Sequence, residues 1–216
     1  MHRVGQFILL AAMCASVSAQ TTRPTDPPAG SAPRDAVRAL NFAMRAGDVT
    51  AMKQLFLATT PAESRMIDAD VEMAAALARL REAAVKAYGA QGANIITGET
   101  DASAVESASH IDSADVVITG DVATVTYRDQ KNSPWVLKKV DGHWRIPVAQ
   151  MGKPMDPASL DQRLSDLAAQ RHVVDEMAEQ IRQKKFATPE QARETWRTRI
   201  LQAATSQPAA RPEKSS

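Results

Sequence analysis

Between Ala114 and Val148, apolar and polar residues alternate in two blocks, each interrupted by a two-residue turn. Alternation with a period of two is typical of strands that bury one face. Gly120-Asp121 has its glycine first, which suits a type II′ turn, whereas Asp141-Gly142 suits a type I′ turn. The pattern therefore predicts two β-hairpins, joined by residues 129–133, that form a four-stranded antiparallel meander.

The two turns also fix the register of the strands. Counting outward from them gives these opposing pairs: Ile118 and Ala123, Val116 and Val125, Ala114 and Tyr127, Lys139 and Trp144, Leu137 and Ile146, Trp135 and Val148. Most of the large apolar groups then share one face. We expect helices to cover that face.

Before the hairpins, apolar residues recur at helical spacing. Val37, Leu40 and Met44 predict a first helix that ends at Gly47, and Met52, Leu55 and Phe56 predict a short second one. Thr60-Pro61-Ala62-Glu63 has the form of a capping box and opens a longer helix that reaches Tyr88. Residues 93–113 favour neither a helix nor a strand.

After the hairpins, Asp156-Pro157 marks the start of a long amphipathic helix that runs to about Lys185. Its apolar stripe has near-heptad spacing, interrupted by Arg171, and consists of Leu160, Leu164, Leu167, Val174, Ala178 and Ile181. Packing into the core is the favoured role of this stripe, and self-association is the alternative. A second capping box, Thr188-Pro189-Glu190-Gln191, opens a last helix that carries Ala192, Trp196 and Ile200.

The first residues are typical of a secretory signal peptide. A basic start at Arg3 precedes an apolar run from Phe7 to Ala12, and Val17-Ser18-Ala19 is a small-residue cleavage pattern. The predicted organisation is a signal peptide at 1–19, a flexible linker at 20–33, an α+β domain at 34–150, a helical extension at 151–204 and a disordered tail at 205–216. These residues predict a secreted or periplasmic protein with no membrane span after signal removal.

Composition narrows the classes of partner. The net charge is +1, which gives no basis for binding nucleic acid through phosphates. Cys14 is the only cysteine and lies in the predicted signal, so we expect the mature chain to be stabilised by packing alone. Nothing in the sequence predicts a cofactor.

The order of these elements resembles the nuclear transport factor 2-like superfamily, which includes ketosteroid isomerase and the SnoaL-like proteins. The resemblance rests on Ala46-Gly47-Asp48 after the first helix, on Thr119-Gly120-Asp121-Val122-Ala123, and on Asp141-Gly142-His143-Trp144-Arg145-Ile146. It implies N-terminal helices packed on a curved antiparallel sheet, in a cystatin-like cone with an internal pocket. No catalytic residue is carried over, because the acids, bases and donors of the enzymes in that superfamily do not align onto this chain.

Two groups of residues are candidates for chemistry. His110, Asp112 and Asp115 have the residue types of an acid–base or metal cluster, but such residues also commonly satisfy turn backbone groups, which is the reading we favour. His143 and His172 are interpreted as solvated. Tyr127, Trp135 and Trp144 lie on the sheet face expected to point inward, where they either line a pocket or fill the core.

The leading hypothesis is a secreted or periplasmic, non-enzymatic domain that binds a small apolar ligand or a protein partner, with a homodimer through the sheet as one form. One alternative is an isomerase or lyase for a small carbonyl compound, which requires a buried carboxylate or histidine facing the aromatic side chains. The other is an envelope scaffold that acts through its C-terminal helices.

Overall fold

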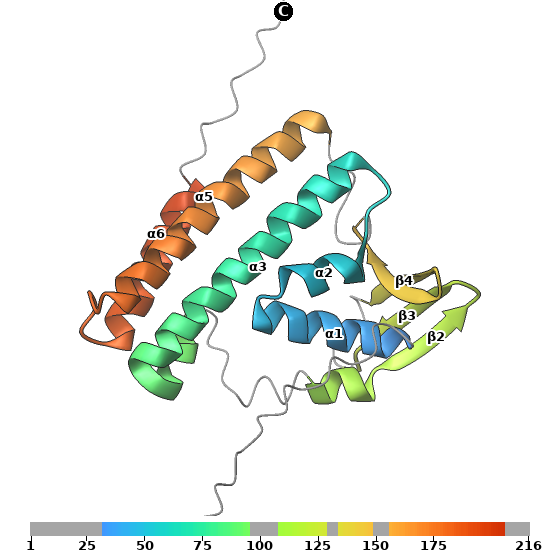
Figure 1. Cartoon of the computed structure of the whole chain (residues 1–216), viewed down its shortest axis with the longest axis horizontal. Helices are drawn as coiled ribbons and strands as arrows, with labels where there is room; N and C mark the ends of the chain where they lie inside the picture. The colour runs from blue at the N-terminus through green and yellow to red at the C-terminus, as the bar shows by residue number, and fades with distance from the viewer. Residues whose placement is uncertain (1–31, 96–107, 129–133, 149–155, 206–216) are drawn as a thin grey trace, which may run out of the picture.

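The computed structural model describes residues 32–95, 108–128, 134–148 and 156–205, and there the chain has an α+β fold (Figure 1). The predicted signal peptide, the linker up to residue 31 and the tail from residue 206 lie outside the described residues. The elements along the chain are α1 (Pro33–Ala46), α2 (Val49–Leu55), β1 (Phe56–Leu57), α3 (Pro61–Tyr88), the 3-10 helix η1 (Gly89–Ile95), β2 (Asp115–Thr119), β3 (Val122–Thr126), β4 (Trp135–Val140), β5 (His143–Pro147), α5 (Pro157–Arg182) and α6 (Pro189–Thr205).

Both predicted hairpins are confirmed. Strands β2 and β3 pair with Ile118 opposite Ala123 and Val116 opposite Val125, and β4 and β5 pair with Lys139 opposite Trp144. Gly120 alone has a positive φ in the first turn, as type II′ requires, whereas Asp141 and Gly142 both have one, as type I′ requires.

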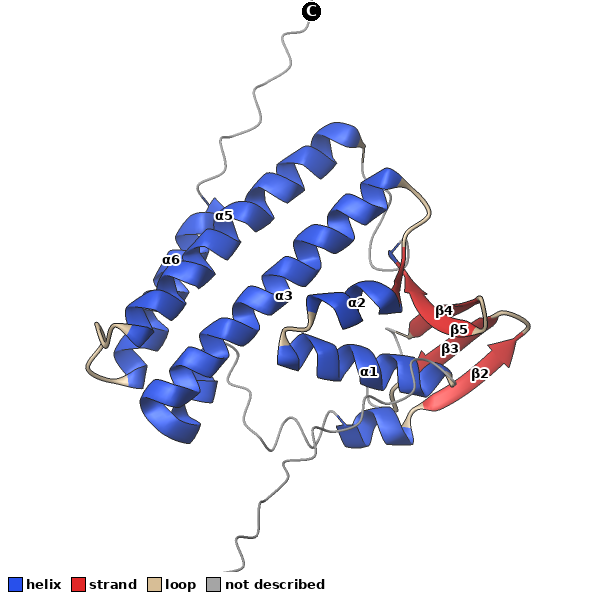
Figure 2. Ribbon diagram, in the orientation of Figure 1, coloured by secondary structure: helices blue, strands red, loops and turns tan. Residues whose placement is uncertain are grey.

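The sheet differs from the predicted meander by one strand. Phe56, predicted to lie in the second helix, instead begins β1, which pairs parallel to β5 with Phe56 beside Ile146. The sheet is therefore mixed and five-stranded, in the order β1-β5-β4-β3-β2 (Figure 2). Phe56 lies next to Ile146 on the buried face of the sheet, and both side chains belong to the same core cluster. A buried residue at this position also fits the helical spacing of Met52 and Leu55, and for that reason the sequence pattern placed it in the helix. Strand β2 forms the remaining edge.

Local capping explains where the helices begin and end. Gly47 adopts a left-handed conformation after α1, and the Asp48 side chain accepts from the Ala51 N–H at the start of α2. The capping box of α3 is confirmed, since Thr60 accepts from the Glu63 N–H and Glu63 accepts from the Thr60 N–H. Because Glu63 also accepts from both donors of Thr59, the pKa of its carboxyl is lowered. Helix α5 starts at the predicted Asp156 cap but ends at Arg182, three residues before the predicted Lys185, and Lys184 follows with a positive φ.

Helices α3 and α5 lie side by side and run in the same direction (Figure 1). Arg65 pairs with Asp161 near their starts at 2.7 Å, and Arg79 pairs with Asp175 farther along at 2.8 Å. Both pairs join residues 96 positions apart, so the two helices keep one register along their length. Arg171, which interrupts the apolar stripe, pairs with Glu72 of α3.

The buried side chains form two main clusters on different stretches of α3. The sheet-side cluster joins α1, α2, the first half of α3 and the sheet, and includes Val37, Leu40, Met52, Val71 and Leu137. The helix-side cluster joins the second half of α3 with η1, α5 and α6, and includes Leu80, Val174, Met177, Ile181 and Trp196. A smaller group, Met66, Leu160 and Leu167, lies where α3 and α5 begin. The α5 stripe is thus packed into the core, as favoured from the sequence.

Candidate functional site

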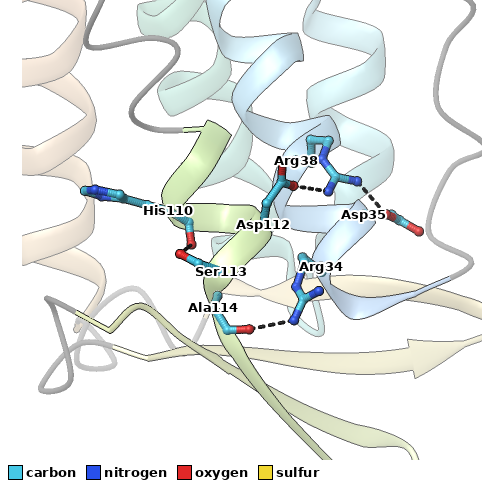
Figure 3. A network of polar contacts seen from close by, with 7 residues as sticks. All are labelled: Arg34, Asp35, Arg38, His110, Asp112, Ser113 and Ala114. Atoms are coloured by element: carbon cyan, nitrogen blue, oxygen red, sulfur yellow. Dashed lines mark hydrogen bonds and ion pairs between the residues drawn. The ribbon is translucent and has the colours of Figure 1, made fainter.

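A polar network fixes the point where β2 begins (Figure 3). Arg34 of α1 donates from Nη2 to the Ala114 carbonyl oxygen at 2.6 Å. Arg38, one turn later, bonds Asp35 at 2.7 Å and also Asp112 of the short helix at 108–113. The hydrogen bond to Asp112 raises the pKa of the Arg38 guanidinium. The network therefore holds the short helix and the first residue before β2 against α1.

The candidate acid–base cluster is separated by this network. Asp112 forms an ion pair with Arg38, and the His110 side chain points away from these two residues (Figure 3). Asp115 lies exposed on β2. In the described ranges, no group of three His, Cys, Asp or Glu residues is placed to hold a metal ion. Asp112 therefore pairs with an arginine side chain of α1, and the reading that His110 and Asp115 satisfy turn backbone groups stays a prediction.

The three aromatic candidates all contribute to the sheet-side cluster. Trp144 is buried within it, with 4% of its surface exposed, and the Lys139 ammonium lies 5.9 Å from its ring centroid. Tyr127 and Trp135 are half-buried and pack against the same cluster. Side chains of α1 and α2 fill the space over this face, among them Val37, Leu40 and Met52. An open pocket lined by the three aromatic residues stays a prediction.

An open pocket of about 370 Å³ lies elsewhere, where α2 meets α3 and α5. Its walls are Val49, Glu72, Ala75, Arg79, Arg171 and Asp175. Each arginine is already paired with a carboxylate across the helix interface, Arg79 with Asp175 and Arg171 with Glu72. The charges of the pocket thus balance one another, and the groups that would recognise an ion are used to hold the two helices together.

The sheet edge formed by β2 is the most unusual surface of the described chain. Val117 and Ile118 are exposed by 64% and 55%, and Val122 on the neighbouring strand by 40%. The sequence placed Ile118 on the inward face, which its pairing with Ala123 bears out. Its exposure was missed because the sheet-side cluster reaches Val116 but not Ile118 at the turn end of β2, and spacing along the chain cannot show how far a helix reaches. One signal in the sequence could have indicated this exposure: β2 is the first strand of the predicted meander, and the first strand of a meander lies at an edge of the sheet.

Natural proteins usually protect such an edge. Lysine, proline, a β-bulge or a covering segment interrupts the row of unpaired backbone groups. The sequence of β2, Asp-Val-Val-Ile-Thr, contains neither lysine nor proline, and all five residues pair with β3 without a bulge. Beyond the charged Asp115 at its start, this strand therefore offers regular geometry together with apolar side chains.

Searches of protein-family models, curated proteins and solved structures find no match to this chain. The resemblance to the nuclear transport factor 2-like superfamily accordingly stays a prediction. Among the described residues, no helix has the length and apolar character needed to cross a membrane.

Proposed function

We propose that this protein is a non-enzymatic interaction domain of the secreted or periplasmic space that accepts an extended strand of a protein partner along β2. The observation that carries the proposal is the exposure of Val117 and Ile118 on an edge strand whose described residues include no lysine, proline or bulge. Addition of a strand to a sheet edge is a recurring mode of protein recognition, in which backbone hydrogen bonds supply affinity and alternate side chains supply specificity. The extracytoplasmic location is supported by the leader-like first residues alone.

The distribution of polar groups favours binding over catalysis. In the part of the chain that the structure describes, no polar or charged residue is buried, and the enzyme hypothesis needs a carboxylate or histidine buried beside the aromatic side chains. The space over the inner sheet face is occupied by helix side chains, which supports a protein partner over a small apolar ligand.

Site-specific photo-crosslinking in the producing cell tests this proposal. A photoreactive amino acid replaces Thr119 at the exposed end of β2, and the matched control carries it at Arg193, which is exposed on α6. We expect covalent protein adducts at position 119 in several-fold excess over position 193, with the crosslinked partner identified by mass spectrometry. Equal adduct yields at the two positions, or none at position 119, would overturn the proposal.

A further inference from the structure

The backbone groups along the open edge of β2 can be identified from the turn. Thr119 and Val122 flank a two-residue turn, so the Thr119 carbonyl accepts from Val122 and these two residues form a hydrogen-bonded pair. Hydrogen-bonded and non-hydrogen-bonded pairs alternate in an antiparallel ladder. Asp115, Val117 and Thr119 therefore bond to β3, whereas Val116 and Ile118 direct their N–H and C=O groups toward the open edge.

The edge is closed immediately before these residues. The Ala114 carbonyl oxygen accepts from Arg34 at 2.6 Å, and the Ala114 N–H donates to the Ile111 carbonyl at 3.3 Å. The groups that β2 offers to another strand are thus two N–H donors and two C=O acceptors, on Val116 and Ile118. This set is short, and it is symmetric about Val117.

We propose that the strand added to β2 is β2 of a second copy of this chain, antiparallel and centred on Val117. This inference rests on the proposed function. A two-fold axis through Val117 sets Val116 opposite Ile118 of the second copy, and the reverse, so that all eight edge groups form four hydrogen bonds. The sheets of the two copies then join into one continuous sheet.

Charge and hydrogen bonding select this register over its two neighbours. Centring the pair on Val116 would require the Ala114 groups, which are already used by Arg34 and Ile111. Centring it on Ile118 would place Asp115 directly opposite Asp121 of the second copy, and like charges at opposed positions are destabilising. With Val117 at the centre, Asp115 faces Thr119, whose hydroxyl can donate to the carboxylate.

The same register covers the exposed apolar groups. Val117 and its symmetry mate form a non-hydrogen-bonded pair, in which side chains approach most closely. On the opposite sheet face, Ile118 packs beside Val116 of the second copy and so extends the sheet-side cluster to which Val116 already belongs. Both large apolar side chains that are more than half exposed on β2 are thereby covered by the one arrangement.

Sedimentation velocity on the purified protein, over a range of concentrations, tests the inference with two matched variants. Val117→Lys and Thr119→Lys add the same charge to the same face of β2. We expect the unmodified protein to form dimers and Val117→Lys to raise the dimer Kd by at least about tenfold, because two lysines meet at the axis. Thr119→Lys is expected to keep the dimer, since its ammonium faces Asp115 of the second copy.

Cysteine substitution reads the register directly. Opposed Cα atoms in a non-hydrogen-bonded pair lie about 4.5 Å apart, within the range that a disulfide spans. When oxidised glutathione is added, Val117→Cys is expected to form a disulfide-linked dimer, with glutathione reduced as the two thiols are oxidised. Thr119→Cys is not expected to do so, because the two copies of residue 119 lie four residues apart in this register. Any crosslink through Cys14 would occur equally in both variants.

The outcomes separate this inference from the proposed function. A protein that is monomeric at every concentration, or a dimer that survives Val117→Lys, overturns the pairing with a second copy. If the protein is monomeric while position 119 crosslinks to a different protein in the cell, the edge is a binding site and only the identity of the partner is wrong. If neither dimer nor adduct is found, both proposals fail.

Discussion

The two halves of the molecule that share α3 treat their apolar side chains differently. On the helix side, α5 and α6 bury their stripes against α3, and the ion pairs between α3 and α5 lie at the margin of that interface. On the sheet side, α1 and α2 cover the inner face as far as Val116 of β2, while Val117 on the outer face and Ile118 on the inner face are exposed. Val85 and Leu201, which are exposed on the helix side, lie on different helices. Large apolar side chains are therefore exposed singly on the helix side, whereas two of them lie on one edge strand of the sheet side, which is the edge that we propose binds a partner.

Of the changes considered, deleting residues 156–216 is expected to have the largest effect on stability. The deletion removes α5 and α6 and exposes the face of α3 that carries Ala76, Leu80 and Ala84, all of which are completely buried. Burial of one large apolar side chain contributes about 1.5–3 kcal/mol, and whole domains are stable by only about 5–15 kcal/mol. We expect the truncated protein to lose its cooperative thermal transition in circular dichroism. A truncated protein that melts cooperatively would instead make α5 and α6 an appendage, as the scaffold hypothesis requires.

Replacing one leucine in each half tests whether the halves behave independently. Leu137 on β4 and Leu80 on α3 are both completely buried, in different clusters. We expect Leu137→Ala and Leu80→Ala each to lower the free energy of unfolding by about 2–5 kcal/mol in urea titrations. The loss of unfolding free energy in the double variant should equal the sum of the two single losses within about 0.5 kcal/mol, because the two sites share no partner. A larger deviation would show that α3 couples the halves energetically.

Trp144 and Trp196 report on the two halves separately, since each is buried in a different cluster. In Trp196→Phe, Trp135 and Trp144 remain as reporters of the sheet side. We expect their fluorescence and the circular dichroism signal to change at the same urea concentration, because the two halves unfold in one transition.

The parts of the fold that were predictable from sequence are those specified by neighbouring residues. Turn chemistry at Gly120-Asp121 and Asp141-Gly142 sets the strand register, and the caps at Thr60 and Asp156 set two helix starts. The parallel pairing of Phe56 with β5 was missed because it joins segments distant along the chain. The same holds for the candidate site: Ile118 was placed on the correct sheet face, but its exposure depends on how far the helices extend over the sheet, which no local pattern encodes.

Reversing an ion pair between α3 and α5 should have a moderate effect. Glu72 pairs with Arg171, and both side chains are partly exposed. Glu72→Arg would place two arginines together, and we expect a loss of about 0.2–1 kcal/mol in the free energy of unfolding, the range typical of exposed pairs. Combining it with Arg171→Glu restores the opposite charges and should recover most of that loss. If the double variant loses as much free energy of unfolding as the two single variants together, or more, these residues do not act as a pair.

The smallest expected effect comes from Asp70, a half-buried carboxyl on α3. Burial raises its pKa, and the charge of Arg163 on α5 opposes that rise only in part. Because the folded state holds the proton more tightly than the unfolded state, ionisation costs stability as the pH rises through the ordinary aspartate range, and the cost is complete above the folded pKa.

Asp70→Asn should therefore raise the Tm at pH 7, and this gain should disappear near pH 3, where the carboxyl is protonated in both states. The control is Asp68→Asn on the same helix, where Asp68 forms a 2.6 Å ion pair with Lys53 and the substitution removes an attraction. A lower Tm for Asp70→Asn at pH 7 would mean that Arg163 dominates over burial, and that the contact between α3 and α5 gains from this charge.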